Sequence, residues 1–224
     1  MTTVIGIRYP QVDLALLIAD RQATNNNMRE KHIDRRKIQT SQDGMYAFGH
    51  SGLANEDLYQ LAEKMYAGKI DMQKILKEGK FPELKELNLA RMGDKTPTAE
   101  NSSSFLVVSR FDGKPALHTC WPLGAVEPRT LTWIGSGSKS IEDYYAALGV
   151  MMEARNYLNT QRPPTSDDLI RLGLEAVRYA QSRDLYSHGL DLIALTPNQT
   201  VDCVKDLEDD FSERIKNIQA KIKV

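Results

Sequence analysis

The sequence predicts an α+β protein in which two antiparallel sheets pack face to face, with helices on their outer sides. Strand-like apolar runs come in groups joined by turn residues, and segments with helical apolar spacing follow them in pairs. The predicted order is strands, two helices, strands, two helices, strands and a last helix. This order suits two layers of sheet covered by helices.

The composition is that of an ordinary globular protein. The chain has 224 residues, of which 41% are hydrophobic and 26% charged, so we expect one domain spanning 1–224. A formal net charge of -1 gives no electrostatic case for binding nucleic acid. We expect no membrane span and no signal peptide, and therefore a cytoplasmic protein.

The few cysteines and histidines predict neither a disulfide framework nor a metal site. The two cysteines, Cys120 and Cys203, lie far apart in the sequence and are expected as reduced core residues. The four histidines show no metal-binding spacing. We therefore expect no metal and no cofactor.

The first twenty residues, MTTVIGIRYPQVDLALLIAD, predict a hairpin. Its strands are the apolar runs Val4 to Ile7 and Leu14 to Ala19. An antiparallel hairpin centred near Gln11 places Asp20 opposite Thr2. A hydroxyl and a carboxylate would then be neighbours.

Thr2 has the chemistry of an N-terminal nucleophile. Removal of Met1 would give Thr2 a free α-amine, whose unperturbed pKa of roughly 7.7 to 8.0 leaves a useful neutral fraction near pH 7. A hydroxyl and a general base on one residue are the parts of nucleophilic catalysis by an N-terminal threonine. Threonine is also a common second residue, so Thr2 alone does not establish a catalytic nucleophile.

A glycine-rich segment follows the next pair of strands. Strands are predicted at Lys37 to Ser41 and Met45 to Phe48, then a turn at Gly49 to Gly52 and a helix at Glu56 to Tyr66. Backbone N–H groups in a turn that opens a helix are suited to holding an oxyanion.

The remaining elements follow the same logic of apolar spacing and turn residues. Thr165 and Asp168 form a capping-box-like start to one of the helices. The segment GSGSKS lacks the spacing of a phosphate loop. The predicted elements are a helical region Asp71 to Met92 interrupted near Gly79 to Pro82, strands Phe105 to Ser109, Ala116 to Cys120 and Leu131 to Ile134, helices Ile141 to Tyr157 and Ser166 to Ser182, strands Asp191 to Leu195 and Thr200 to Val204, and a C-terminal helical tail at about 208–224.

Four blocks in order make the chain resemble the proteasome β-subunit and HslV family of N-terminal nucleophile hydrolases. These blocks are TTVIGI with ADRQAT, SRFDGKPALHTCWPLGAV, WIGSGS and RDLYS, and together they span most of the chain. The resemblance implies a four-layer αββα sandwich. Segment 77–103 and the C-terminal tail are longer than in HslV.

The resemblance also implies a set of site residues. Thr2 matches the nucleophile, Asp20 the aspartate that pairs with a lysine, and Lys37 that lysine, with Arg36 as the second choice. A lysine ammonium beside Thr2 would favour the alkoxide and the neutral amine. Ser136 matches the serine of the Gly-Ser-Gly block. Asp184 and Ser187 match the pair that positions the amine and water. Ser51 is the preferred backbone donor to the oxyanion.

The activity implied by the resemblance is that of a threonine endopeptidase, a hydrolase of peptide bonds. It would work in a homo-oligomeric ring on peptides or unfolded proteins, with an ATPase unfoldase as a partner. Two alternatives remain open: a catalytically silent scaffold subunit, or an amidase or peptide transferase of the same fold. A retained Met1 would block the amine and with it this mechanism.

Overall fold

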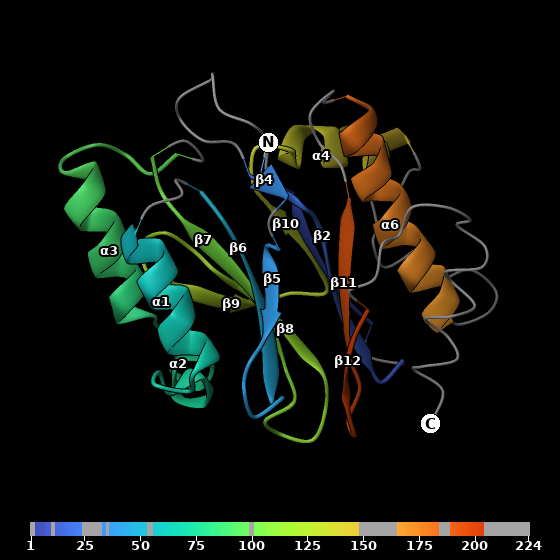
Figure 1. Ribbon diagram of the computed structural model, residues 1–224, viewed down its shortest axis with the longest axis horizontal. Helices are drawn as coiled ribbons and strands as arrows, with labels where there is room; N and C mark the ends of the chain where they lie inside the picture. The colour runs from blue at the N-terminus through green and yellow to red at the C-terminus, as the bar shows by residue number, and fades with distance from the viewer. Residues whose placement is uncertain are drawn as a thin grey trace.

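Two five-stranded antiparallel sheets form the centre of the protein (Figure 1). The computed structural model describes residues 3–9, 12–23, 33–34, 36–52, 56–98, 101–147, 165–183 and 189–203. The first sheet has the order β10-β1-β2-β11-β12. Its strands are β10 (Leu131–Ile134), β1 (Val4–Tyr9), β2 (Leu14–Asp20), β11 (Leu190–Leu195) and β12 (Thr200–Asp202).

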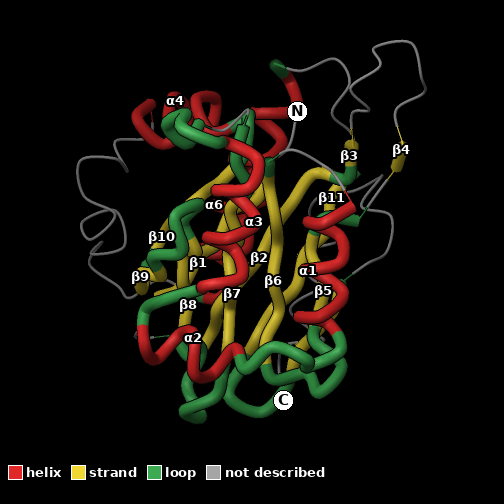
Figure 2. The backbone as a smooth tube through the Cα atoms, turned by 90° about the vertical axis from the view of Figure 1, so that its left-hand side faces the viewer, coloured by secondary structure: helices red, strands yellow, loops and turns green. Residues whose placement is uncertain are grey.

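The second sheet has the order β5-β6-β7-β8-β9 and is formed by the middle of the chain. Its strands are β5 (Ile38–Thr40), β6 (Tyr46–Ser51), β7 (Ser104–Ser109), β8 (Ala116–Cys120) and β9 (Val126–Pro128). A separate two-stranded pair, β3 (Gln22–Ala23) with β4 (Ile33–Asp34), extends beyond the ends of the two sheets (Figure 2).

Helices cover the outer face of each sheet. Figure 1 shows one group of helices beside the second sheet and another beside the first. Those on the second sheet are α1 (Glu56–Tyr66), α2 (Met72–Glu78) and α3 (Pro82–Met92), and those on the first are α4 (Ser138–Ala147) and α6 (Ser166–Ser182).

Strand β2 explains why the chain forms four layers. All seven of its residues are buried, because it has an apolar neighbour on both faces. Leu14, Leu16 and Ile18 pack with α4 and α6, whereas Leu17 on the opposite face packs with residues of the second sheet such as Leu106. A third apolar cluster joins the second sheet to α1, α2 and α3. The fold is therefore an α+β arrangement with a continuous core between the sheets.

Helix α6 is fixed at its start and along its length. Thr165 and Asp168 form a reciprocal capping box, with Asp168 in the place of the usual Glu or Gln. Gly173 allows the helix to approach the first sheet closely, since a Cβ there would lie 2.2 Å from Ile18 Cδ1 and 3.0 Å from Ile7 Cδ1. The sequence predicted both the bounds of this helix and its cap.

Several other expectations are confirmed. Helix α1 has the predicted bounds, and the interruption between α2 and α3 occurs at Gly79, which ends α2 with φ +70°, and Pro82, which begins α3. Cys120 and Cys203 are not in a disulfide, and they are buried in different apolar clusters. Burial raises the pKa of the Cys120 thiol to about 12.

Other boundaries differ from the predictions. Strand β6 continues to Ser51 instead of ending at Phe48. Helix α4 is described over Ser138–Ala147, so it begins before the predicted Ile141, and the predicted end at Tyr157 lies outside the described residues. The predicted tail helix at about 208–224 also lies outside them. The short strand β9 was not predicted.

Candidate functional site

A buried ion pair lies where β1 begins, β2 ends and β5 begins. Asp20, the last residue of β2, has 0% exposure, and Lys37, just before β5, has 4%. Lys37 Nζ donates to Asp20 Oδ2 at 2.7 Å. The Thr3 amide donates to the other carboxylate oxygen, Oδ1, at 2.6 Å. Asp20 thus connects the second sheet to the start of β1.

The hairpin register differs by one residue from the prediction. Val4 lies opposite Ala19 and Tyr9 opposite Leu14, and the Asp20 amide donates to the Thr3 carbonyl at 3.2 Å. Asp20 therefore faces Thr3 and not Thr2. The physical reason is that the connection between β1 and β2 spans four positions, 10–13. The hairpin is therefore centred between positions 11 and 12 and not on Gln11. Since both faces of these strands are apolar, the hydrophobic pattern did not discriminate between the registers.

In the observed register, Asp20 contacts the peptide group at the start of β1. The amide nitrogen of Thr3 belongs to the peptide group that joins Thr3 to residue 2. The Asp20 carboxylate is therefore bonded to the peptide group through which residue 2 is attached to β1. The Asp20 carboxylate, which also accepts from Lys37, is thus bonded to the peptide group that follows the predicted nucleophile in the sequence.

A buried ion pair adds little to the stability of a fold. Removing two charges from water costs several kcal/mol for each ion, and apolar pairs of similar size are often as stabilising. Asp20 and Lys37 are held by good geometry, and the Thr3 amide satisfies the second carboxylate oxygen. Buried charge pairs at the end of a sheet are candidates for a chemical role.

A second ionic cluster lies beside the first and was missed by sequence reasoning. Asp191 of β11 has 0% exposure, and its carboxylate oxygens lie 3.7 Å from Arg21 Nε and 4.0 Å from Arg36 Nε. Arg36 also donates to Asp202 of β12 at 2.5 Å. The available signal was the single carboxylate in the apolar run Leu190–Leu195. Arg36, the second choice for the lysine role, belongs to this cluster and does not pair with Asp20.

The end of β6 approaches β1 closely. A Cβ on Gly49 would lie 2.7 Å from Val4 Cγ1 and 2.8 Å from Ile38 Cγ2, so only glycine fits without displacing them. The His50 amide donates to the Lys37 carbonyl at 3.4 Å. Ser51 is 5% exposed and pairs with Ser104 in the ladder. Ser51 is thus the last residue of a strand, not part of an open turn, and its role as an oxyanion donor stays a prediction.

Ser136 lies at the same end of the first sheet. It is exposed and sits between β10 and α4, two residues after Ile134, which pairs with Val4. The strand end that carries Ser136 therefore adjoins the start of β1. Its position agrees with a site at this end, and its role stays a prediction.

Three predicted site residues lie outside the described residues. They are Thr2, Asp184 and Ser187. Of the predicted residues that the structure describes, Asp20 and Lys37 are in direct contact, and Ser51 and Ser136 lie at the same end of the sheets. In these parts of the chain, no group of three His, Cys, Asp or Glu side chains could hold a metal ion.

The comparisons with known proteins assign no family. No protein-family model matches the chain, and no curated protein matches it. Over the described ranges, no helix combines the length and the apolar character needed to cross a bilayer.

Proposed function

We propose that the protein is a threonine-type endopeptidase of the N-terminal nucleophile class, with Thr2 as the nucleophile once Met1 is removed. The observation that carries the proposal is the position of Asp20. Its buried carboxylate accepts from the Lys37 ammonium at 2.7 Å and from the Thr3 amide at 2.6 Å. A buried carboxylate that is bonded both to a lysine and to the peptide group after residue 2 supports Thr2 as such a nucleophile.

In the proposed reaction, Thr2 Oγ attacks the scissile carbonyl and its own α-amine takes the hydroxyl proton. The protonated amine then returns the proton to the leaving amine, and water releases the acyl-enzyme. The Lys37 ammonium would disfavour a second positive charge on the nearby amine and so keep it available as a base. Asp20 keeps this ammonium oriented.

The other predicted residues complete the proposal. Asp184, Ser187 and Ser136 would position the amine and water, and a backbone N–H near Ser51 would hold the oxyanion. The finer fold assignment, an N-terminal nucleophile hydrolase sandwich, is supported by the two facing sheets with helices outside. The homo-oligomeric ring and the ATPase partner belong to the same proposal.

The direct test is covalent labelling of the purified protein by an electrophilic peptide, followed by intact-mass measurement. We expect loss of Met1 from the mature chain and addition of one label, which peptide mapping locates at Thr2. Thr2→Ala should abolish labelling, because it removes the hydroxyl and leaves the fold unchanged. Thr96→Ala, a change at an exposed threonine, should leave labelling unchanged.

Other outcomes separate the alternatives. A retained Met1 with no label indicates a scaffold subunit. Loss of Met1 with turnover of small amides, but of no peptide in a fluorogenic panel, indicates an amidase. Labelling that persists in Thr2→Ala would rule out Thr2 as the nucleophile.

A further inference from the structure

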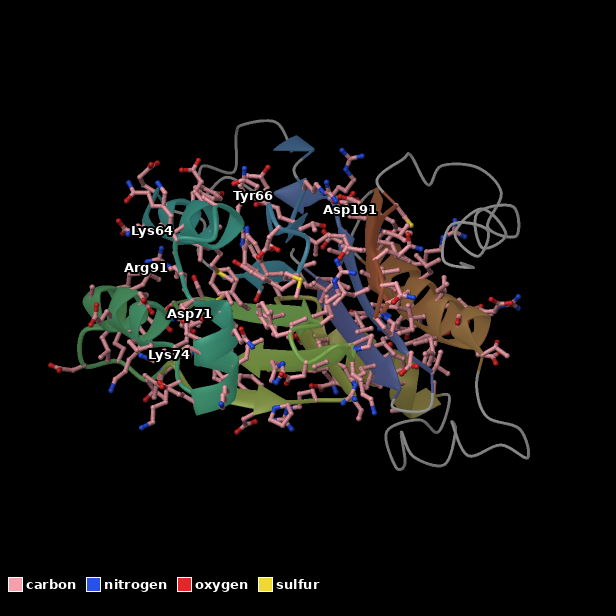
Figure 3. All side chains as sticks on the ribbon, turned by 90° about the horizontal axis from the view of Figure 1, so that it is seen from below. Lys64, Tyr66, Asp71, Lys74, Arg91 and Asp191 are labelled. Carbon is pink, nitrogen blue, oxygen red and sulfur yellow. The ribbon has the colours of Figure 1, made fainter. Side chains whose placement is uncertain are left out.

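Asp191 lies on β11 next to the end of β2, and its carboxylate faces two arginines from different segments. It pairs in the sheet with Ala19, the residue before Asp20. Its oxygens lie 3.7 Å from Arg21 Nε and 4.0 Å from Arg36 Nε. Figure 3 shows Asp191 in the central part of the molecule, between the helices on either side. One buried carboxylate is therefore the counter-charge near two arginine side chains.

These two arginines are the chain neighbours of the Asp20–Lys37 pair. Arg21 directly follows Asp20, and Arg36 directly precedes Lys37. The contacts of the two arginines with Asp191 therefore restrain the two segments that carry the carboxylate and the ammonium. Asp191 contacts both segments from a third strand.

We propose that Asp191 is the positioning residue of the Asp20–Lys37 pair and holds its two segments in register through Arg21 and Arg36. The positional part of this inference depends only on the geometry of the described residues. Its catalytic consequence rests on the proposed function, in which Lys37 acts beside Thr2.

The two carboxylates that contact Arg36, those of Asp191 and Asp202, differ in burial, and we therefore expect their removal to have different effects. Asp191 is at 0% exposure, so its neutralisation removes a buried counter-charge from beside both Arg21 and Arg36. Asp202 lies at the rim, where its side chain is 36% exposed and that of Arg36 is 32% exposed. Water can replace Asp202 but not Asp191. Asp202→Asn is therefore the matched control for Asp191→Asn.

Amide hydrogen exchange tests the positional inference without any activity. The His50 amide, which donates to the Lys37 carbonyl, and the Asp20 amide, which donates to the Thr3 carbonyl, report on the two segments. In Asp191→Asn, we expect exchange at both amides to rise by about tenfold while α1 and α6 keep their protection. Asp202→Asn should change neither amide.

Labelling kinetics test the catalytic consequence. In Asp191→Asn, the maximal rate of Thr2 labelling should fall by about 100-fold, since small misplacements of catalytic groups cost this much. The half-saturating concentration of the electrophilic peptide should stay unchanged, because Asp191 does not contact substrate. Asp191→Glu, which keeps the charge, should recover part of the rate.

The outcomes separate this inference from the proposed function. Unchanged exchange at both amides in Asp191→Asn would overturn the inference, whether or not the wild-type protein is labelled. Wild-type protein that is never labelled would contradict the peptidase proposal alone. A fall in rate that appears equally in Asp202→Asn, or only as a higher half-saturating concentration, would also overturn the positioning role. If Asp191→Asn does not fold, Arg36→Gln is measured by the same two readouts.

Discussion

Replacing Lys37 with methionine is expected to cost roughly 3–5 kcal/mol of unfolding free energy, because it leaves the Asp20 carboxylate buried without its cation. Asp20 has 0% exposure, and the change removes the Lys37 ammonium that donates to one carboxylate oxygen, while the Thr3 amide still donates to the other. Labelling of Thr2 should also fall by about 100- to 1000-fold, as expected for the loss of an electrostatic group in an active site. Denaturant unfolding and labelling rates measure the two effects.

A double variant separates the structural effect from the catalytic one. Lys37→Met with Asp20→Leu replaces the whole pair by apolar side chains, which often restores stability. We expect it to recover most of the lost unfolding free energy but none of the labelling. Lys139→Met is the control, since Lys139 is exposed and pairs with Asp143 at the surface. Restored labelling in the double variant would contradict a catalytic role for Lys37.

The second large effect is expected at Gly52, which follows Ser51 at the end of β6. Gly52 has φ +120°, and a Cβ there would lie 2.2 Å from the Ser102 carbonyl oxygen and 2.7 Å from Ser103 Cα. Both are backbone atoms and cannot turn away. Gly52→Ala should therefore destabilise the fold by roughly 3 kcal/mol, from a strained backbone and a steric clash together.

Gly68 provides the matched control. It also has a positive φ, +66°, but a Cβ there would meet nothing within 4 Å. Gly68→Ala should cost only the conformational penalty of about 1–2 kcal/mol. Thermal or denaturant unfolding of both variants measures the difference. Equal destabilisation would mean that the β6 end can move away from Ser102.

The predicted parts of the structure are those that local sequence determines. Helix α6 is specified by its capping box and by an apolar stripe, and α2 ends at a glycine with φ +70°. The Asp20–Lys37 contact was predicted because a family resemblance supplied a relation that neither residue reveals alone.

The parts that were not predicted depend on packing between distant segments. The hairpin register was wrong because both faces of β2 are buried, so no polar face fixed it. Gly49 indicated a turn, whereas its actual role is to let β6 approach Val4. Asp191 was missed because its contacts, Arg21 and Arg36, lie far away in the sequence.

The way in which the sheets are joined has a consequence for the order of folding. The first hairpin pairs with β10 on one side and with β11 on the other, and Thr200 Oγ1 donates to the Gly44 carbonyl in the turn between β5 and β6. Arg36 and Asp202 are 166 positions apart. Such long-range contacts form late, since each closes a long loop of chain. A chain still emerging from the ribosome therefore lacks the contacts of Arg36 with Asp191 and Asp202, which form only after β11 and β12 have been made.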